Sequence, residues 1–285
     1  MRKTLESYGF PDGSFPKLLN SAGVRQPEET LSTGVRAFLI SLRDRGLRDT
    51  TQHLHARCIK AYLNWAVREG DLAVSPMTKV TMPRVGKSFL PSLTLEEVKR
   101  LLAECNRRTA VGARNYAMIL TLLDTGLRAN ELVQLKIGDI DPRTGVCTLI
   151  GKGRKQRVVR VGRTARSAIV RMLQFRQDAP PESPLWIAYD IQGREDGRLS
   201  VHGLQTMIRR TARKAGVEDC GPHRFRRTFA VWCLRDGMDL RSLQILMGHS
   251  SLIVLQRYLS LDTADLERAH AMHSPVDKGL VNIRP

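Results

Sequence analysis

The sequence predicts a mainly α-helical protein with one small β-hairpin, built as two domains. Apolar residues recur at three- and four-residue spacing through most of the chain, which is the period of an amphipathic helix. Two short runs rich in β-branched residues, 146–150 and 157–161, flank a glycine-rich segment and predict the hairpin. A basic stretch with two prolines, residues 82–91, predicts a linker between the domains.

Two helices are expected before this linker. Residues 1–26 show little periodicity and contain several Gly and Pro, so we expect loop there, with at most a short helix near Phe15–Asn20. Pro27 and the two glutamates after it begin an apolar helical pattern that ends at Gly46. A second helix is predicted over residues 49–69, because its apolar positions fall on one face.

The elements after the linker are predicted in the same way. Thr94 and Glu97 have the spacing of a capping box, which starts a helix over residues 96–107. A helix over residues 114–125 follows, and Glu131 lies on the next short helix. After the hairpin, periodic apolar residues predict helices over residues 164–177, 202–215, 223–236, 239–247, 251–259 and 263–270.

The charge of the chain favours a polyanionic partner. Lys and Arg number 46 against 28 acidic residues, a formal net charge of +18 on 285 residues. Neutralising phosphates releases condensed counterions, so such a surplus favours binding to nucleic acid. The excess is +6 over residues 1–87 and +12 over the remainder, so both domains could touch nucleic acid. A basic protein without such a partner remains the alternative.

Cysteine usage and hydropathy predict a soluble protein of a reducing compartment. The five cysteines lie far apart and never form Cys-x-x-Cys, which argues against a disulfide framework or a zinc site. The first residues lack the apolar run of a signal peptide, and no apolar stretch approaches the roughly 20 residues of a membrane span. We therefore expect a cytoplasmic protein.

Five segments carry side chains suited to chemistry on a phosphodiester. They read Thr125-Gly-Leu-Arg-Ala-Asn-Glu-Leu132, Gly151-Lys-Gly-Arg-Lys-Gln-Arg157, Gly221-Pro-His-Arg-Phe-Arg226, Leu246-Met-Gly-His249 and Arg257-Tyr258. Two guanidinium groups can hold the non-bridging oxygens of a phosphate bidentately and remain charged. A phenol, with a pKa of about 10, can attack phosphorus if cations and a proton acceptor lie beside it.

This order of residues resembles the tyrosine recombinase (phage integrase) family, with Xer-like members, over residues 28–273. The resemblance implies a site-specific DNA recombinase with a helical core-binding domain and a tyrosine-recombinase catalytic domain. It implies six catalytic residues, namely Arg128, Lys152, His223, Arg226, His249 and Tyr258. Glu131 could orient the guanidinium of Arg128 without itself contacting the phosphate.

The implied chemistry gives each of these residues a role. Tyr258 attacks the phosphodiester and leaves a 3′-phosphotyrosyl enzyme, while Lys152 protonates the departing 5′ oxygen. His223 and His249 act as acid–base groups or as phosphate donors. Lys152 could instead grip a groove phosphate and Lys155 could take either role; His249 could be merely structural.

Partners follow from the same resemblance. Neighbouring basic side chains are predicted to contact DNA, namely Arg154, Lys155, Arg157, Arg224 and Arg227. Four protomers would hold two duplex recombination sites and exchange strands through a Holliday junction, in integration, excision or resolution. No metal and no nucleotide cofactor are expected, and a bacterial or mobile-element source is implied.

The domain boundaries expected from the pattern are a largely irregular extension over 1–26, a core-binding domain over 27–81, the linker over 82–91, a catalytic domain over 92–273 and a tail over 274–285. Family members usually have four or more helices before the linker, so this core-binding domain is predicted to be reduced. The helix expected near residues 262–273 resembles the one that family members pass to a neighbouring subunit. It could equally pack on its own domain.

Two other functions remain open from the sequence. A type IB topoisomerase shares the nucleophile and the arginines, although the Gly-Lys-Gly hairpin and the chain after Tyr258 favour a recombinase. The second alternative is a non-catalytic DNA-binding regulator, derived from a recombinase that has lost its activity. The complete catalytic set argues against decay.

Overall fold

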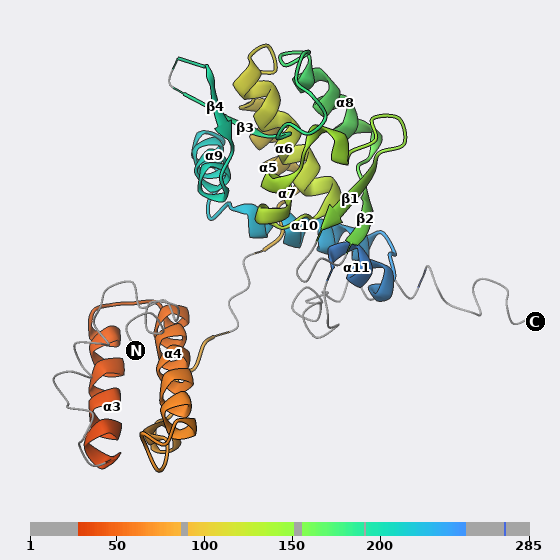
Figure 1. Ribbon diagram of the computed structural model, residues 1–285. Coiled ribbons are helices and arrows are strands. Elements are labelled where there is room, and N and C mark those ends of the chain that lie inside the picture. Colours follow the sequence, from red (N-terminus) through yellow and green to blue (C-terminus); the bar gives the residue numbers. More distant parts are fainter. Residues whose placement is uncertain (1–27, 87–90, 151–155, 191, 249–270, 272–285) are drawn as a thin grey trace, which may run out of the picture. The chain divides into compact units, whose positions relative to one another are not determined.

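The computed structural model describes residues 28–86, 91–150, 156–190, 192–248 and 271. The chain divides into two compact units, residues 1–88 and 89–285, and the division falls inside the basic stretch predicted as the linker. The helices predicted near 15–20, 251–259 and 263–270 lie outside the described residues. The mainly helical fold with small antiparallel sheets is confirmed (Figure 1).

The first unit packs two antiparallel helices around a small apolar core. Helix α3 (Glu28–Asp44) and helix α4 (Asp49–Arg68) are followed by a short 3-10 helix, η1 (Pro76–Lys79), which contacts both. Leu42, Ile59 and Leu63 are almost fully buried in this core. Both predicted helices are present, and their apolar stripes form the core as the period required.

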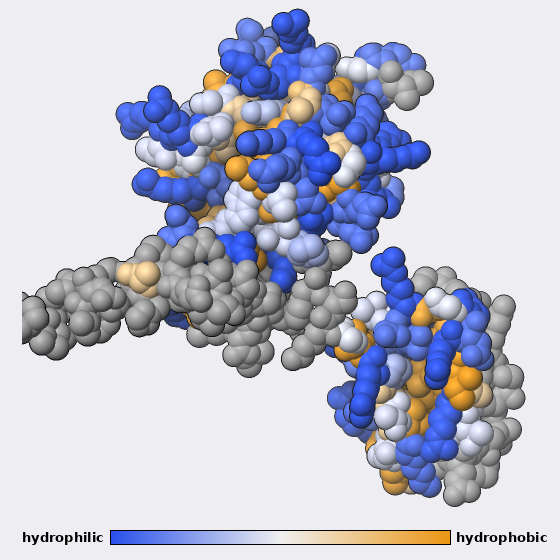
Figure 2. All heavy atoms as spheres, turned by 180° about the vertical axis from the view of Figure 1, so that it is seen from behind, coloured by the Kyte–Doolittle hydropathy of each residue, from blue (hydrophilic) through white to orange (hydrophobic). Residues whose placement is uncertain are grey.

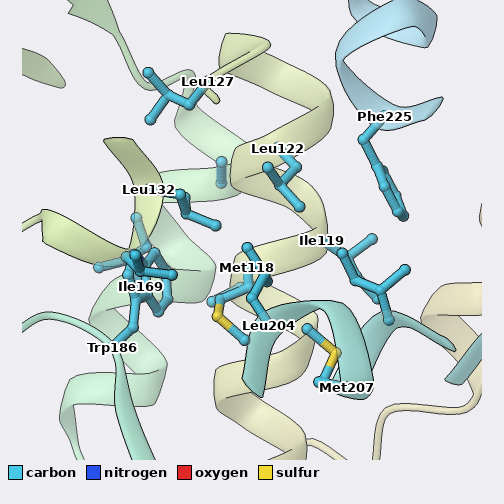
Figure 3. Close-up of a cluster of buried hydrophobic side chains, with 14 of the residues drawn as sticks. Met118, Ile119, Leu122, Leu127, Leu132, Ile169, Trp186, Leu204, Met207 and Phe225 are labelled. Atoms are coloured by element: carbon cyan, nitrogen blue, oxygen red, sulfur yellow. The ribbon is translucent and has the colours of Figure 1, made fainter. Parts of the chain in front are cut away.

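The second unit is built around helix α6 (Ala110–Thr125). Helices α8 (Arg163–Leu173) and α10 (Pro222–Arg235) pack against it, as Figure 1 shows. Figure 3 shows Met118, Ile119 and Leu122 of α6 among side chains that come from several other elements. These three residues are fully buried, and each such burial contributes roughly 1.5–3 kcal/mol.

The described part of this unit contains four further helices. They are α5 (Leu95–Ala103), α7 (Ala129–Gln134), α9 (Val201–Lys214) and α11 (Leu240–Met247), with a 3-10 turn η2 (Ile137–Asp139) after α7. The predicted capping box of Thr94 and Glu97 is confirmed by both of its hydrogen bonds. Helix α6 begins earlier than predicted because Thr109 caps it, whereas α5 and α8 end several residues before the predicted positions.

Two small antiparallel sheets accompany the helices. Strands β1 (Val146–Ile150) and β2 (Gln156–Arg160) pair from Val146↔Arg160 to Ile150↔Gln156, which confirms the predicted hairpin. Strands β3 (Ile187–Tyr189) and β4 (Glu195–Arg198) form a second sheet that the sequence did not predict. In Figure 2, hydrophilic side chains predominate on the visible face of the second unit.

Candidate active site

The turn between α6 and α7 positions Arg128. Gly126 ends α6 in the left-handed region, at φ 60°, and a Cβ there would lie 2.3 Å from Phe229 of α10. Glycine is therefore required both by the backbone conformation and by the packing of α10 against the turn. Arg128 follows as the N-cap of α7, and its side chain is 41% exposed.

Arg226 lies deeper in the same region, on α10. It is only 3% exposed, and its guanidinium donates to Gly126 O at 2.6 Å and to Met247 O at 2.7 Å. These carbonyls belong to the C-terminal ends of α6 and α11, where the helix dipole is negative and attracts a cation. Arg226 therefore bridges two helix ends. His223 lies one turn earlier on α10 and is exposed.

The C-terminal end of α11 brings the two arginines together. Arg128 Nη2 donates to Gly248 O at 3.0 Å, and Arg226 Nη2 donates to the preceding carbonyl, that of Met247. Gly248 ends α11 at φ 61°, a left-handed conformation common at helix ends, where the last carbonyls have no partner within the helix. Figure 1 shows α7, α10, α11 and the β1–β2 hairpin gathered at one end of the second unit.

Glu131 is the ionic partner of Arg128. Its carboxylate accepts from the Arg128 backbone N at 2.8 Å and from Arg128 Nη1 at 3.0 Å. Arg157 of β2 donates to both carboxylate oxygens, at 2.9 and 2.8 Å. Burial acts to raise the pKa of Glu131, but the hydrogen bonds from Arg157 and Arg128 outweigh it and lower the pKa to about 2. Glu131 is thus ionised at neutral pH.

Several predicted site residues cannot be placed. Lys152, Arg154 and Lys155 lie between β1 and β2, outside the described residues, and so do His249 and Tyr258 after α11. The described residues bring together Arg128, Glu131 and Arg226, and they bring them to Gly248, the residue directly before His249. The roles of all six predicted catalytic residues stay predictions.

Two of the side chains predicted to contact DNA are paired within the protein. Arg224 is 8% exposed and donates to Glu97 at 2.8 Å, to Glu218 O and to Pro91 O. Arg157 points at Glu131, with 14% of its side chain exposed. Both guanidinium groups are turned into the protein, and their contact with DNA stays a prediction. Arg227 is half-buried on α10.

The pairing of Arg157 with Glu131 was not found from the sequence. The signal available was the period of β2, because Arg157 and Val159 are two apart and so lie on one face of the strand. Val159 is buried in the core, so Arg157 also faces inward and needs an anionic partner. The sequence predicted a DNA contact for Arg157 because it is a basic residue near a glycine-rich turn.

No group of three or more His, Cys, Asp or Glu among the described residues could hold a metal ion. No helix among them is long and apolar enough to cross a membrane.

Comparison with known proteins identifies the family. The pattern of the phage integrase family matches residues 91–265, more than half of the chain. The chain belongs to the phage integrase family. This membership confirms the predicted enzyme class, a tyrosine-type site-specific DNA recombinase.

Individual relatives of the family are similar over most of the chain. Tyrosine recombinase XerD of Pseudomonas putida is 32% identical over 81% of this chain and 78% of the relative. Tyrosine recombinase XerC of Proteus mirabilis is 29% identical over 95% of this chain and 88% of the relative. The Xer-like resemblance predicted from the motifs is thereby confirmed.

Solved structures of the family have the same fold. The XerA recombinase is 26% identical with a TM-score of 0.55, covering 96% of this chain and 93% of that one. The XerH recombinase bound to palindromic difH, a post-cleavage complex, is 23% identical with a TM-score of 0.70, covering 94% of this chain and 79% of that one.

Proposed function

We propose that the chain cleaves and rejoins DNA with Tyr258 as nucleophile and with Arg128 and Arg226 as the groups that hold the scissile phosphate. One observation carries this assignment. The two arginines come from different helices, yet they donate to consecutive carbonyls, Gly248 O and Met247 O, at the end of α11. Two permanent positive charges thus converge one residue before His249 and ten before Tyr258.

The proposed step conserves the energy of the phosphodiester bond that it breaks. The phenolic oxygen of Tyr258 forms a bond to phosphorus, and the bond from phosphorus to the 5′ oxygen breaks. Lys152 gives its proton to that oxygen, and His223 takes the proton of the phenol. The guanidinium groups stabilise the negative charge that develops on the non-bridging oxygens. Reversal by the 5′ hydroxyl of another strand rejoins DNA.

The first unit supplies a second surface for the duplex. Arg57, Lys60, Asn64 and Arg68 are all exposed and recur at helical spacing along α4, opposite its buried face. Three of these four side chains are cationic and can neutralise successive phosphates of a groove. We assign this stripe to contact with the DNA backbone.

Assembly and location complete the proposal. Four protomers act on two duplexes, because strand exchange requires two cleaved sites to be held together. XerH is described as bound to its difH substrate, and the similarity of fold supports a DNA complex here. The curated relatives are bacterial proteins, which supports action in a bacterial cytoplasm.

The test is a nicked duplex carrying sequence from beside the gene for this protein, incubated in metal-free buffer. The proposal predicts an SDS-resistant adduct that is absent with Tyr258→Phe. An adduct that persists in this variant would overturn the assignment of the nucleophile. No adduct, together with intact salt-sensitive binding, would favour the non-catalytic DNA-binding protein.

A second assay separates recombinase from topoisomerase. On a supercoiled plasmid carrying two copies of the cleaved site, a recombinase yields products with rearranged segments. A type IB topoisomerase yields only relaxed circles of the original sequence. Relaxation without rearrangement, at protein concentrations that cover both sites, would overturn the recombinase assignment.

A further inference from the structure

Arg157 has no role in the proposed reaction, but it is paired with a residue that contacts Arg128. Its guanidinium forms a two-pronged ion pair with Glu131, with nitrogen–oxygen distances of 2.9 and 2.8 Å. Arg128 shares the same carboxylate at 3.0 Å. Oε1 of Glu131 accepts from the side chains of Arg157 and Arg128. Oε2 accepts from the side chain of Arg157 and from the backbone N of Arg128. About four acceptor sites of a carboxylate are thus filled.

The other side of Arg157 lies against the end of α11. A Cβ built on Gly248 would lie 2.9 Å from Cζ of Arg157 and 3.0 Å from Nε and Nη1. The guanidinium therefore packs directly on the backbone of Gly248, whose carbonyl oxygen accepts from Arg128. Arg157, on β2, thus contacts both acceptors of the Arg128 guanidinium, the carboxylate of Glu131 on α7 and the backbone of Gly248 at the end of α11.

The charges explain why this arrangement matters for Arg128. Glu131 is buried apart from 11% of its side chain, and Arg128 and Arg157 both pair with it. With Arg157 present the group of three carries a net positive charge. Without it, Glu131 would neutralise Arg128 alone, and two freed acceptor sites would draw its guanidinium away from Gly248 O.

We propose that Arg157 is a positioning residue for Arg128: it occupies the carboxylate of Glu131 and the backbone of Gly248 so that the Arg128 guanidinium stays at the end of α11 with its charge available to phosphate. The inference rests on the proposed function, because it assigns the benefit to the cleavage step. Arg157 lies on β2, five residues after Lys152 in the sequence.

The experiment is a double-mutant cycle between Arg157→Gln and Glu131→Gln. The rate of adduct formation is measured in a single turnover with protein saturating on the nicked duplex, and the Kd for DNA is measured separately. We expect each single variant to cleave about tenfold or more slowly, the loss that corresponds to roughly 1.4 kcal/mol of barrier. The double variant should cleave no more slowly than either single variant, because Arg157 acts through the carboxylate that Glu131→Gln removes.

Arg160→Gln is the matched control, since Arg160 is an exposed arginine on the same strand. It removes the same charge and should leave the saturated cleavage rate unchanged. Arg157→Lys tests the need for two parallel hydrogen bonds to Glu131, because a single ammonium keeps the charge but cannot form both. The cleavage rate of this variant should lie between those of wild type and Arg157→Gln. Thermal unfolding of each variant confirms that it is folded at the assay temperature, and Arg157→Lys serves if Arg157→Gln is not.

The outcomes separate the two claims. If wild type forms no adduct, the proposed function fails and the positioning role falls with it. If wild type forms the adduct but saturated Arg157→Gln cleaves as fast as Arg160→Gln, the positioning role is overturned and the function stands. Multiplicative losses in the double variant would also overturn it, because Arg157 and Glu131 would then act independently.

Discussion

At the scale of single residues, partners rather than residue types decide what each arginine does. The chain has 46 basic residues, and the sequence could select Arg128 and Arg226 only through the motifs around them. It could not separate Arg157 and Arg224 from true surface cations, because burial depends on contacts with Glu131 and Glu97 that are distant in sequence. The period of β2 places Arg157 on the buried face of the strand, but no local pattern identifies its distant partner.

The buried pair of Arg224 and Glu97 yields a prediction about stability. Arg224→Met leaves Glu97 as a largely buried charge without its partner, so the free energy of unfolding should fall by about 3–5 kcal/mol. Urea unfolding measures this loss. The double variant Arg224→Met with Glu97→Gln should recover part of it, since no unpaired charge remains. Unchanged stability of Arg224→Met, with weakened DNA binding, would contradict the structural role and favour a contact with DNA.

Glu131 predicts how stability depends on pH. Its pKa in the folded protein is about 2, below the usual 4.5, because Arg157 and Arg128 outweigh the effect of burial. A lowered carboxylate pKa stabilises the folded state above the unfolded pKa, and this contribution is lost as pH falls from about 4.5 towards 2. Glu131→Gln should therefore lower stability at pH 7 by about 3 kcal/mol, the equivalent of the shift. The gap should close as pH falls to about 2.5. A gap that stays constant across this range would contradict the ionised pairing.

At the scale of elements, apolar period and turn chemistry predicted most helices and the first hairpin. The capping box at Thr94, the glycine at the end of α6 and the β-branched strands β1 and β2 all carry local signals. Strand β4 does not. β4 reads Glu-Asp-Gly-Arg, which has no β-branched or aromatic residue, so pairing with Ile187 and Tyr189 alone defines it.

The end of α11 gives an element-scale prediction. Gly248→Ala meets two costs, a strained left-handed backbone and a clash with Arg157. Gly216→Ala is a matched control, because Gly216 has φ +62° and its nearest atom would lie 3.7 Å away, an ordinary contact. Circular dichroism melts should show a larger loss for Gly248→Ala, and its cleavage rate should also fall. Equal losses and unchanged cleavage would show that the contact with Arg157 is unimportant.

At the scale of the whole molecule, the positive charge of both units predicts an affinity for DNA that depends strongly on salt concentration. The logarithm of affinity should fall linearly with the logarithm of salt concentration, with a slope of about −0.9 for each phosphate neutralised. Arg57→Gln or Lys60→Gln should each reduce that slope by about 1 and weaken binding to all sequences alike. Fluorescence anisotropy over a range of salt concentrations measures it. Arg43→Gln, an exposed change on α3, is the control, and an equal effect of all three would exclude a specific stripe on α4.

The central claim is that Tyr258 becomes joined to DNA beside two arginines that meet at the end of α11. The most direct measurement is mass spectrometry of the peptide that remains attached to a trapped DNA strand after proteolysis. The account predicts one nucleotide-bearing peptide, with Tyr258 linked to a 3′ phosphate, and its loss in Arg128→Ala. Attachment through another residue, or through a 5′ phosphate, would contradict it.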